Sequence, residues 1–320
     1  MRTWVASALM VTATWPVVAN QWVMGPPFGT GGASGISMAY DSRRGRVVLY
    51  AGCYRTLEFD GANWSAGPNF CNAYGEHTMT FFPTRARMVL ASDEWDLFAE
   101  YDGTTWVEGA NPLGGDLLWQ ASAYDGIGDR VIVCGGARGG GNDPDAQAVA
   151  YDGTSWSRVA SLRTTLAGHA MVHDSRRNVV VLYGGYDITG TTQDRVDEFD
   201  GTSWIPRPRP PPGLGARYWH AMAFDPGLGK TVVFGGYGAP ADTWTYDGTT
   251  WSVEPPPPPL LTPRWLHAMA YSAEAGGVVL AGGDDGALRN DTWIFGAAAP
   301  STSRRRSCRR HSWERLTRRR

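Results

Sequence analysis

The hexapeptide YDGTTW at residues 101–106 is one of five near-identical copies in this chain, and these copies decide the fold. The other copies are FDGANW at 59–64, YDGTSW at 151–156, FDGTSW at 199–204 and YDGTTW at 246–251. Their Trp residues follow one another at intervals of 42, 50, 48 and 47 residues. A period of about 40–50 residues is typical of folds that repeat one supersecondary unit, because a single unit cannot bury its own apolar faces.

The rest of the repeat is carried by gap-free blocks of 17 residues, at 36–52, 77–93, 120–136, 169–185, 220–236 and 267–283. Each block contains two apolar runs separated by turn residues, such as Asp174 and Asn178, and these runs predict strands 1 and 2 of a hairpin. Strand 3 is expected to end at the aromatic residue of the hexapeptide. Asp-Gly then turns the chain, and the Trp begins strand 4. Six such four-stranded antiparallel sheets, arranged radially, predict an all-β, six-bladed propeller.

The two ends of the repeat region complement each other. The sixth block is followed by Phe295-Gly296 but lacks a strand-4 Trp. Trp22 lies 14 residues before Ile36, which matches the step from Trp to the next block elsewhere. The N-terminal strand is therefore predicted to complete the last blade, which would remove the free sheet edges.

These repeats resemble the kelch family. The resemblance lies in four hydrophobic residues, a Gly-Gly pair and two spaced aromatic residues, with Gly pairs at 135–136, 184–185, 235–236 and 282–283. Blades 1 and 2 depart from the pattern, because residues 51–52 and 92–93 are Ala-Gly and Ser-Asp. The resemblance covers 20–296 and implies a kelch-type propeller. It implies binding more often than catalysis, although galactose oxidase and a sialic-acid mutarotase are similar to the family in fold.

The segments outside the repeats have their own character. Residues 1–19 resemble a signal peptide, with Arg2, an apolar stretch at 4–11 and Val-Val-Ala at 17–19, and they predict a secreted or periplasmic protein. Residues 297–320 lack the repeat and are expected to form a disordered tail, which is either solvated or bound to an anionic envelope surface or nucleic acid. The sequence contains no run of 18 consecutive apolar residues, so no membrane-spanning helix is predicted.

Charge and cysteine content bear on two questions: whether the protein binds nucleic acid and whether it contains a disulfide. Net charge is −2, but 304–320 holds nine Arg and one Glu, so the remainder carries about −10 and nucleic-acid binding is not expected. In an exported protein a Cys53–Cys71 disulfide is one option, left open by the sequence. Cys134 fits a core strand. We expect a monomer.

Loop lengths indicate which face of the propeller binds a ligand. The turns between strands 1 and 2 and between strands 3 and 4 share one face, and their lengths are constant. The 2–3 loops vary from 6 to 14 residues and the 4–1 loops from 12 to 15. Because loops that differ on a rigid scaffold usually carry function, the 2–3 and 4–1 face is the predicted binding face.

The candidate ligand-binding residues lie just before strand 1. In the kelch family, Arg and small polar residues at this position often project into a pocket, and Arg217 and Arg264 match it. The full candidate set adds their aromatic neighbours and equivalents: Arg217, Arg264, Tyr218, Trp219, Trp265 and Trp119. Guanidinium groups beside flat rings would suit a carboxylate, a sulfate or an acidic sugar; the alternative is packing between blades with exposed Arg.

Four block-initial histidines, with Gln120 and Ile36, are expected to surround the axis: His77, His169, His220 and His267. Hydrogen bonding between blades is favoured over a metal site, because every one of them occupies a repeat position. The sequence contains no GxSxG, HExxH or P-loop motif, and neither a cofactor nor a catalytic residue is predicted. The expected function is a non-catalytic binding module for a protein or glycan. A mutarotase-like enzyme acting on an acidic sugar, and a structural spacer, are the alternatives.

Overall fold

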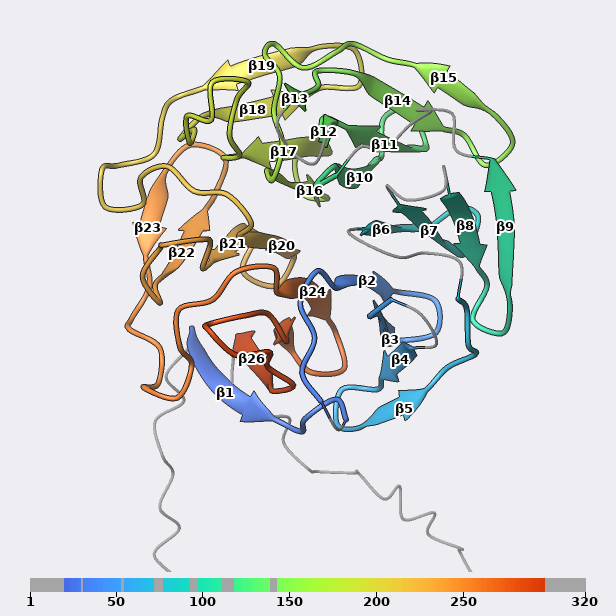
Figure 1. The fold of residues 1–320 in the computed structure, drawn as a ribbon, viewed down its shortest axis with the longest axis vertical. Helices are drawn as coiled ribbons and strands as arrows, with labels where there is room; N and C mark the ends of the chain where they lie inside the picture. The colour runs from blue at the N-terminus through green and yellow to red at the C-terminus, as the bar shows by residue number, and fades with distance from the viewer. Residues whose placement is uncertain are drawn as a thin grey trace, which may run out of the picture.

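The computed structural model describes residues 20–29, 31–52, 55–71, 77–92, 97–110, 118–138 and 143–296. The predicted signal peptide, the predicted tail and Cys53 lie outside these residues. The described chain folds into six four-stranded antiparallel sheets around a central axis (Figure 1), which confirms the predicted all-β propeller. Within the described residues no helix is long and apolar enough to cross a bilayer.

The first three blades run from the axis outward in chain order. Blade 1 contains β2 (Ser37–Asp41), β3 (Arg46–Tyr50), β4 (Thr56–Phe59) and β5 (Trp64–Ala66). Blade 2 contains β6 (His77–Phe82), β7 (Arg87–Ser92), β8 (Leu97–Tyr101) and β9 (Trp106–Ala110). Blade 3 contains β10 (Ala121–Asp125), β11 (Arg130–Cys134), β14 (Ala148–Tyr151) and β15 (Trp156–Arg158). Its 2–3 loop adds a small ribbon, β12 (Ala137–Arg138) and β13 (Asp143–Pro144).

The other three blades close the ring. Blade 4 contains β16 (Ala170–Asp174), β17 (Val179–Tyr183), β18 (Val196–Phe199) and β19 (Trp204–Arg207). Blade 5 contains β20 (Ala221–Asp225), β21 (Lys230–Phe234), β22 (Thr243–Tyr246) and β23 (Trp251–Val253). Blade 6 contains β24 (Ala268–Ser272), β25 (Gly277–Ala281), β26 (Thr292–Gly296) and the N-terminal β1 (Gln21–Gly25).

The pairing of β1 with β26 confirms the predicted closure. The strands are antiparallel, with Trp22 opposite Phe295. The Trp22 side chain is only 3% exposed, and its Nε1 donates to Oγ1 of Thr243 in blade 5 at 2.7 Å. Its ring also meets the rings of Phe234 and Phe295, with centroids 5.4 and 5.2 Å apart. The last blade is therefore anchored both within its own sheet and to its neighbour.

The repeated Asp-Gly turn does two jobs. Its carboxylate accepts backbone N–H bonds, as Asp102 Oδ1 does from Thr104 and Thr105 at 2.8 Å each, which fixes the turn. Its glycine has a positive φ, 93° at Gly103, and a Cβ there would lie 2.5 Å from Nε of Arg44 in the preceding blade. The hexapeptide recurs because the turn needs glycine's conformation and the neighbouring blade occupies the space of a side chain.

The apolar core lies between adjacent blades, and strand 2 of each blade is its most buried part. In blade 4, for example, Val180, Val181, Leu182 and Tyr183 are fully buried. One core cluster combines Val181 and Tyr183 with Val233 and Tyr246 of blade 5. Each blade thus buries its apolar surface against its neighbours, as the repeat period predicts.

Replacing Trp22 by Ala should open this closure. We expect the free energy of unfolding to fall by about 3–5 kcal/mol, the usual cost of deleting a large buried aromatic side chain. Val23→Ala is the matched control, because Val23 lies in the same strand but is 61% exposed. Urea unfolding measures both. A change below about 0.5 kcal/mol for Trp22→Ala, the scatter of surface substitutions, would contradict the closure.

Candidate functional site

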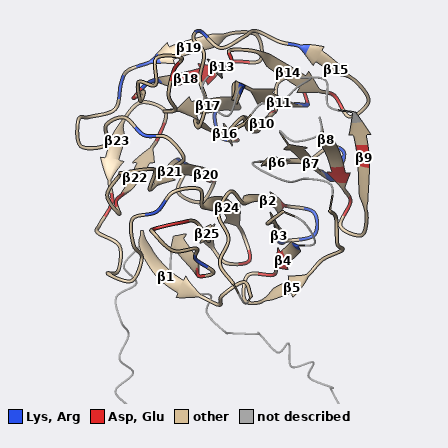
Figure 2. Ribbon diagram, viewed as in Figure 1, with Lys and Arg blue, Asp and Glu red and all other residues tan. Residues whose placement is uncertain are grey.

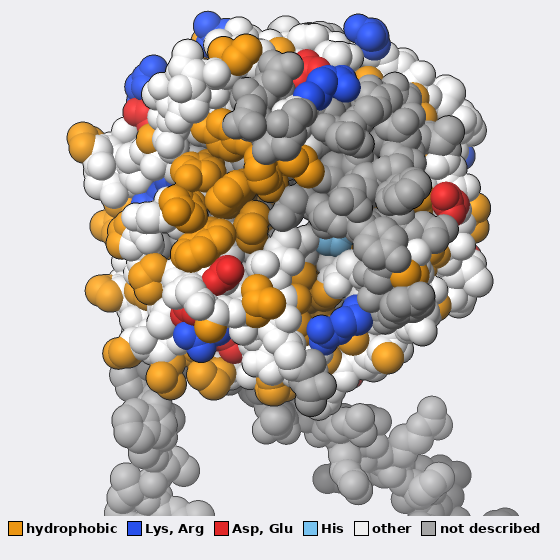
Figure 3. All heavy atoms as spheres, in the orientation of Figure 1, with side chains coloured by type: hydrophobic (Ala, Val, Ile, Leu, Met, Phe, Trp, Pro, Cys, Tyr) orange, Lys and Arg blue, Asp and Glu red, His pale blue; other side chains and the backbone are white. Residues whose placement is uncertain are grey.

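Figures 1–3 view the propeller from the side of the 2–3 and 4–1 loops. Figure 3 shows hydrophobic side chains gathered on this face beside the axis, over β16–β18 and β20–β22. Six aromatic residues from blades 3 to 6 form one connected group there, which we call the aromatic platform: Trp119, Tyr186, Tyr218, Trp219, Tyr237 and Trp265. Ring centroids along the group lie 4.8–6.2 Å apart. Tyr237 is 51% exposed, and the other five rings are half-buried.

The platform brings together all four aromatic residues predicted from the sequence. It also contains Tyr186 and Tyr237, which sequence reasoning missed. Each follows directly on a Gly-Gly pair, and its backbone pairs with the segment before strand 1 of its own blade. An aromatic residue immediately after Gly-Gly was the signal that could have found them.

The backbone beneath the platform is left-handed. The residue just before each axial His, Gln or Ile has positive φ in all five blades where it is described: 65° at Gly35, 60° at Trp119, 65° at Gly168, 55° at Trp219 and 51° at Leu266. For a residue with a side chain this conformation costs roughly 1–2 kcal/mol. Two tryptophans therefore occupy a position at which glycine would be easier.

These left-handed residues are hydrogen-bonded to one another around the axis, in what we call the axial backbone ring. The amide of Gly168 donates to the carbonyl of Trp119 at 3.0 Å, and the amide of Trp219 donates to Gly168 at 2.9 Å. Leu266 then donates to Trp219, and Gly35 donates to Leu266, each at 3.0 Å. The ring joins blades 3, 4, 5, 6 and 1, so it fixes the platform tryptophans relative to the axis.

Below the ring lies a small polar cavity, the axial chamber, with a volume of about 120 Å³. Its lining includes Trp119, Trp219, Gln120 and the four predicted histidines. Several buried polar atoms in this lining make no hydrogen bond of normal geometry within the described chain: Nε1 of Trp119 and Trp219, both amide atoms of Gln120, and both ring nitrogens of His77, His220 and His267. A buried polar atom without a partner costs about 1–3 kcal/mol, so this chamber suits a polar occupant.

Burial keeps the histidines neutral, and three of them, His77, His220 and His267, contact an aromatic ring of the preceding blade. Burial lowers the pKa of His77 to about 4 and the pKa of His267 to about 3. His220 lies against Tyr183 of blade 4, with ring centroids 4.9 Å apart. Within the described ranges no three His, Cys, Asp or Glu side chains converge as metal ligands.

The Gly-Gly pairs make room for these histidines. At Gly235, φ is 67° and a Cβ would lie 2.8 Å from Cε1 of His267 in the next blade. At Gly283, φ is 94° and a Cβ would lie 2.8 Å from the Cβ of the same His267, in its own blade. The first glycine at 135, 184 and 235 packs on the histidine of the next blade, whereas Gly282 packs on Ile36; the second glycine at 185, 236 and 283 packs on the histidine of its own blade.

Arg217 and Arg264 lie beneath the platform, with exposed fractions of 1% and 0%. Each guanidinium forms a two-pronged ion pair with an aspartate of its own blade, Arg217 with Asp242 at 2.7 and 2.9 Å and Arg264 with Asp291 at 2.6 and 3.0 Å. The remaining N–H groups donate to nearby backbone carbonyl oxygens and to a threonine hydroxyl. Contact of these groups with a ligand stays a prediction; the observed contacts make them braces of the 4–1 and 2–3 loops.

The Asp partners could have been anticipated. Only blades 5 and 6 carry Arg at the position three residues before the axial histidine or its equivalent. Only these two blades carry Asp-Thr-Trp at the start of strand 3, at 242–244 and 291–293. The indole of Trp293 donates to Oδ2 of Asp291 at 2.7 Å. Burial opposes ionisation, but the hydrogen bonds from Arg264 and Trp293 hold the pKa of Asp291 below its usual value. Arg, Asp and Trp thus form one unit that appears in two blades.

Comparisons with known proteins support the fold. No protein-family model matches the sequence, and no curated protein matches it. The solved structure of a protein called YjhT is similar to this chain, with a TM-score of 0.68 and 13% sequence identity. The match covers 84% of this chain and 95% of that chain. At this identity the likeness shows the propeller fold alone.

The buried histidines should make stability depend on pH. The pKa of His in an unfolded chain is about 6.5, whereas it is lower in the folded chain. Below about pH 6.5 the unfolded chain therefore binds more protons than the folded chain. The His contribution is therefore complete above about pH 7 and is lost as the pH falls. For His77, with a folded pKa of about 4, the loss between pH 7 and pH 5 is on the order of 2 kcal/mol.

Urea unfolding at pH 7 and at pH 5 measures this loss. His267→Gln provides the matched variant, because blade 3 already has Gln120 at the same repeat position. We expect the variant to lose distinctly less stability than the wild type over this interval. Equal losses would contradict a buried, neutral His267.

Proposed function

We propose that this protein is a kelch-type, non-catalytic module that binds glycans on the face formed by the 2–3 and 4–1 loops. The observation that carries the proposal is the aromatic platform placed directly over the axial chamber. A pyranose has an apolar face of C–H groups and an edge of hydroxyls. Rings of the platform would stack on that face, while a hydroxyl or hydroxymethyl group would reach the unpaired polar atoms of the chamber.

The backbone geometry supports this assignment. Trp119 and Trp219 occupy left-handed positions, whereas blades 1 and 4 have Gly35 and Gly168 there. Strain of this kind is concentrated at functional sites, because a protein without a use for the side chain would do better with glycine. The axial backbone ring holds both indoles in place, so little ordering entropy would remain to be lost on binding.

The chemistry of the face favours an uncharged sugar. Arg217 and Arg264, the groups that would recognise an acidic sugar, are each neutralised by an aspartate. The mutarotase-like alternative requires these guanidiniums to be available to substrate. It therefore receives less support than stacking of a neutral pyranose.

An exported location is part of the proposal. Cleavage after Ala19 would leave β1 whole, beginning at Gln21, and would leave Asn20 to donate to Glu254 at 3.0 Å. The N-terminal residue of protein recovered outside the cytoplasm tests this point. Asn20 is expected, and a mature chain beginning within β1 would contradict it.

A glycan array followed by calorimetry on the best ligand tests the binding face. Trp219→Gly removes the central indole while giving the backbone the residue that blade 4 has at this position. We expect affinity to fall at least tenfold, which corresponds to about 1.4 kcal/mol. Ala86→Gly is the matched control, because Ala86 also has a positive φ, 53°, and lies in a hairpin turn of the opposite face, outside the chamber lining.

The two variants must be compared at equal folded fraction, checked by their unfolding midpoints. Loss of affinity in Trp219→Gly with retention in Ala86→Gly supports the platform. Equal affinity of the wild type and Trp219→Gly would overturn it. Binding restricted to acidic sugars would favour the enzymatic alternative, which anomer exchange measured by NMR would then examine.

A further inference from the structure

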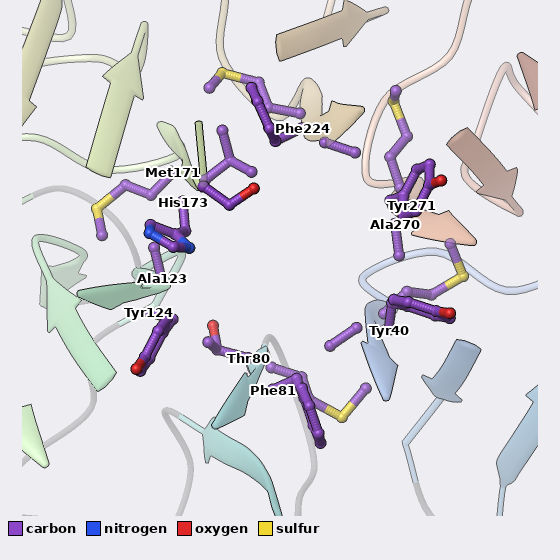
Figure 4. Close-up of a pocket in the computed structure, with 18 of the residues that line it drawn as sticks. Tyr40, Thr80, Phe81, Ala123, Tyr124, Met171, His173, Phe224, Ala270 and Tyr271 are labelled. Atoms are coloured by element: carbon purple, nitrogen blue, oxygen red, sulfur yellow. The ribbon is translucent and has the colours of Figure 1, made fainter. Parts of the chain in front are cut away.

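A cavity larger than the axial chamber lies at the opposite end of the axis, away from the platform and chamber. It has a volume of about 410 Å³ and is lined by the first strand of all six blades and the turns that follow these strands. Figure 4 views it from the side opposite to Figure 1, since the blades follow one another in the reverse sense, and its labelled side chains surround an open centre. We call this cavity the apolar funnel.

Two layers of side chains give the funnel its chemistry. The deeper layer contains a methionine from every blade except blade 3, which has Ser122: Met38, Met79, Met171, Met222 and Met269. The rim contains one ring from each blade: Tyr40, Phe81, Tyr124, His173, Phe224 and Tyr271. Methionine sulfur contacts aromatic rings favourably and its flexible side chain adapts to an occupant.

Among the described residues, no charged side chain lines the funnel. Charged residues lie mainly on outer strands and in turns (Figure 2), and the aspartates that end four of the inner strands face the hairpin turns instead. Asp174, for example, accepts the backbone amides of Arg176 and Arg177, each at 3.0 Å. Burial lowers the pKa of His173, which keeps its imidazole neutral at pH 7.

The buried polar groups of the lining have partners within the chain. The hydroxyls of Thr80 and Ser122 are 2.7 Å apart, and the Tyr124 hydroxyl donates to Asp129 at 2.8 Å. His173 Nε2 lies 2.9 Å from Oδ1 of Asn178. In the part of the chain that the structure describes, none of the buried polar atoms that lack partners belongs to this lining, in contrast to the axial chamber.

We propose that the apolar funnel is a second binding site, for an uncharged aromatic small molecule. The volume lies within the range of about 300–1,000 Å³ found for small-molecule sites. Among the described residues the site has no charged side chain and no buried polar atom without a partner, so it selects against charged ligands, because their desolvation would go uncompensated. Surrounding thioethers and ring edges favour an aromatic occupant over an aliphatic one. The proposal does not depend on glycan binding, which concerns the other face.

Two related dyes test the charge selectivity. N-phenyl-1-naphthylamine is uncharged, and 8-anilino-1-naphthalenesulfonate has the same aromatic body with an added sulfonate. Fluorescence titration of the full-length protein should show saturable binding of the uncharged dye at one site, at least tenfold tighter than binding of the sulfonate. Equal affinities, or no saturable binding, would overturn the proposal.

Variants then place the site. Val172 lines the funnel and is half-buried, so Val172→Trp should fill the cavity and weaken binding of the uncharged dye at least tenfold. Ile127→Trp is the matched control on the same face, because Ile127 is 55% exposed and does not line the funnel. Dye binding that survives Val172→Trp but is lost in Trp219→Gly would assign the dye to the platform and overturn the proposal.

If Val172→Trp folds poorly, a second variant that is expected to gain affinity for the sulfonate dye tests the same site. His173→Lys places a cation at the rim, where it can pair with the sulfonate. We expect this variant to bind the sulfonate dye more tightly than the wild type and the uncharged dye more weakly. An unchanged ratio of the two affinities would place the dyes elsewhere and overturn the proposal.

Discussion

A series of backbone hydrogen bonds, made by left-handed residues around the axis, is the constraint on which the functional end of this propeller depends. The links through Trp119, Gly168, Trp219, Leu266 and Gly35 tie five blades directly to one another. Core packing between blades would tolerate small shifts, whereas hydrogen bonds of 2.9–3.0 Å in series do not. They fix how far the inner strands stand from the axis, and so they set the size of the chamber and the spacing of the platform rings.

The fold was predictable because its determinants are local and repeated. The Asp-Gly turn, the Gly-Gly pair and the Trp spacing each express one requirement of one blade, and six copies make the signal strong. The place of Trp22 in strand 4 of blade 6 was also predictable, because only that blade lacked a strand-4 Trp. The platform was predictable in part, through the alignment of Trp119 with Trp219. Tyr218 and Trp265 were predicted as neighbours of Arg217 and Arg264. Tyr186 and Tyr237 were missed, although each stands directly after a Gly-Gly pair, because only the folded chain shows that this position lies beside the axis.

The role of Arg217 and Arg264 was harder to foresee for a physical reason. Position before strand 1 indicates which direction a side chain takes, but its partners decide whether it reaches solvent. Asp242 and Asp291 lie 25 and 27 residues further along the chain, across the intervening hairpin. An arginine with a two-pronged carboxylate partner and backbone acceptors is a structural tie.

Blade 6 combines β1 with β24–β26, so the propeller can close only when both ends of the repeat region are available. β1 leaves the ribosome first, yet β26, the strand it pairs with, is among the last to emerge. Bringing together segments so distant in sequence is slow compared with forming the hairpins of a single blade. Until then both strands present open edges, which are templates for association with other chains. We therefore expect the pairing of β1 with β26 to be a late step of folding, after the hairpins of the individual blades have formed.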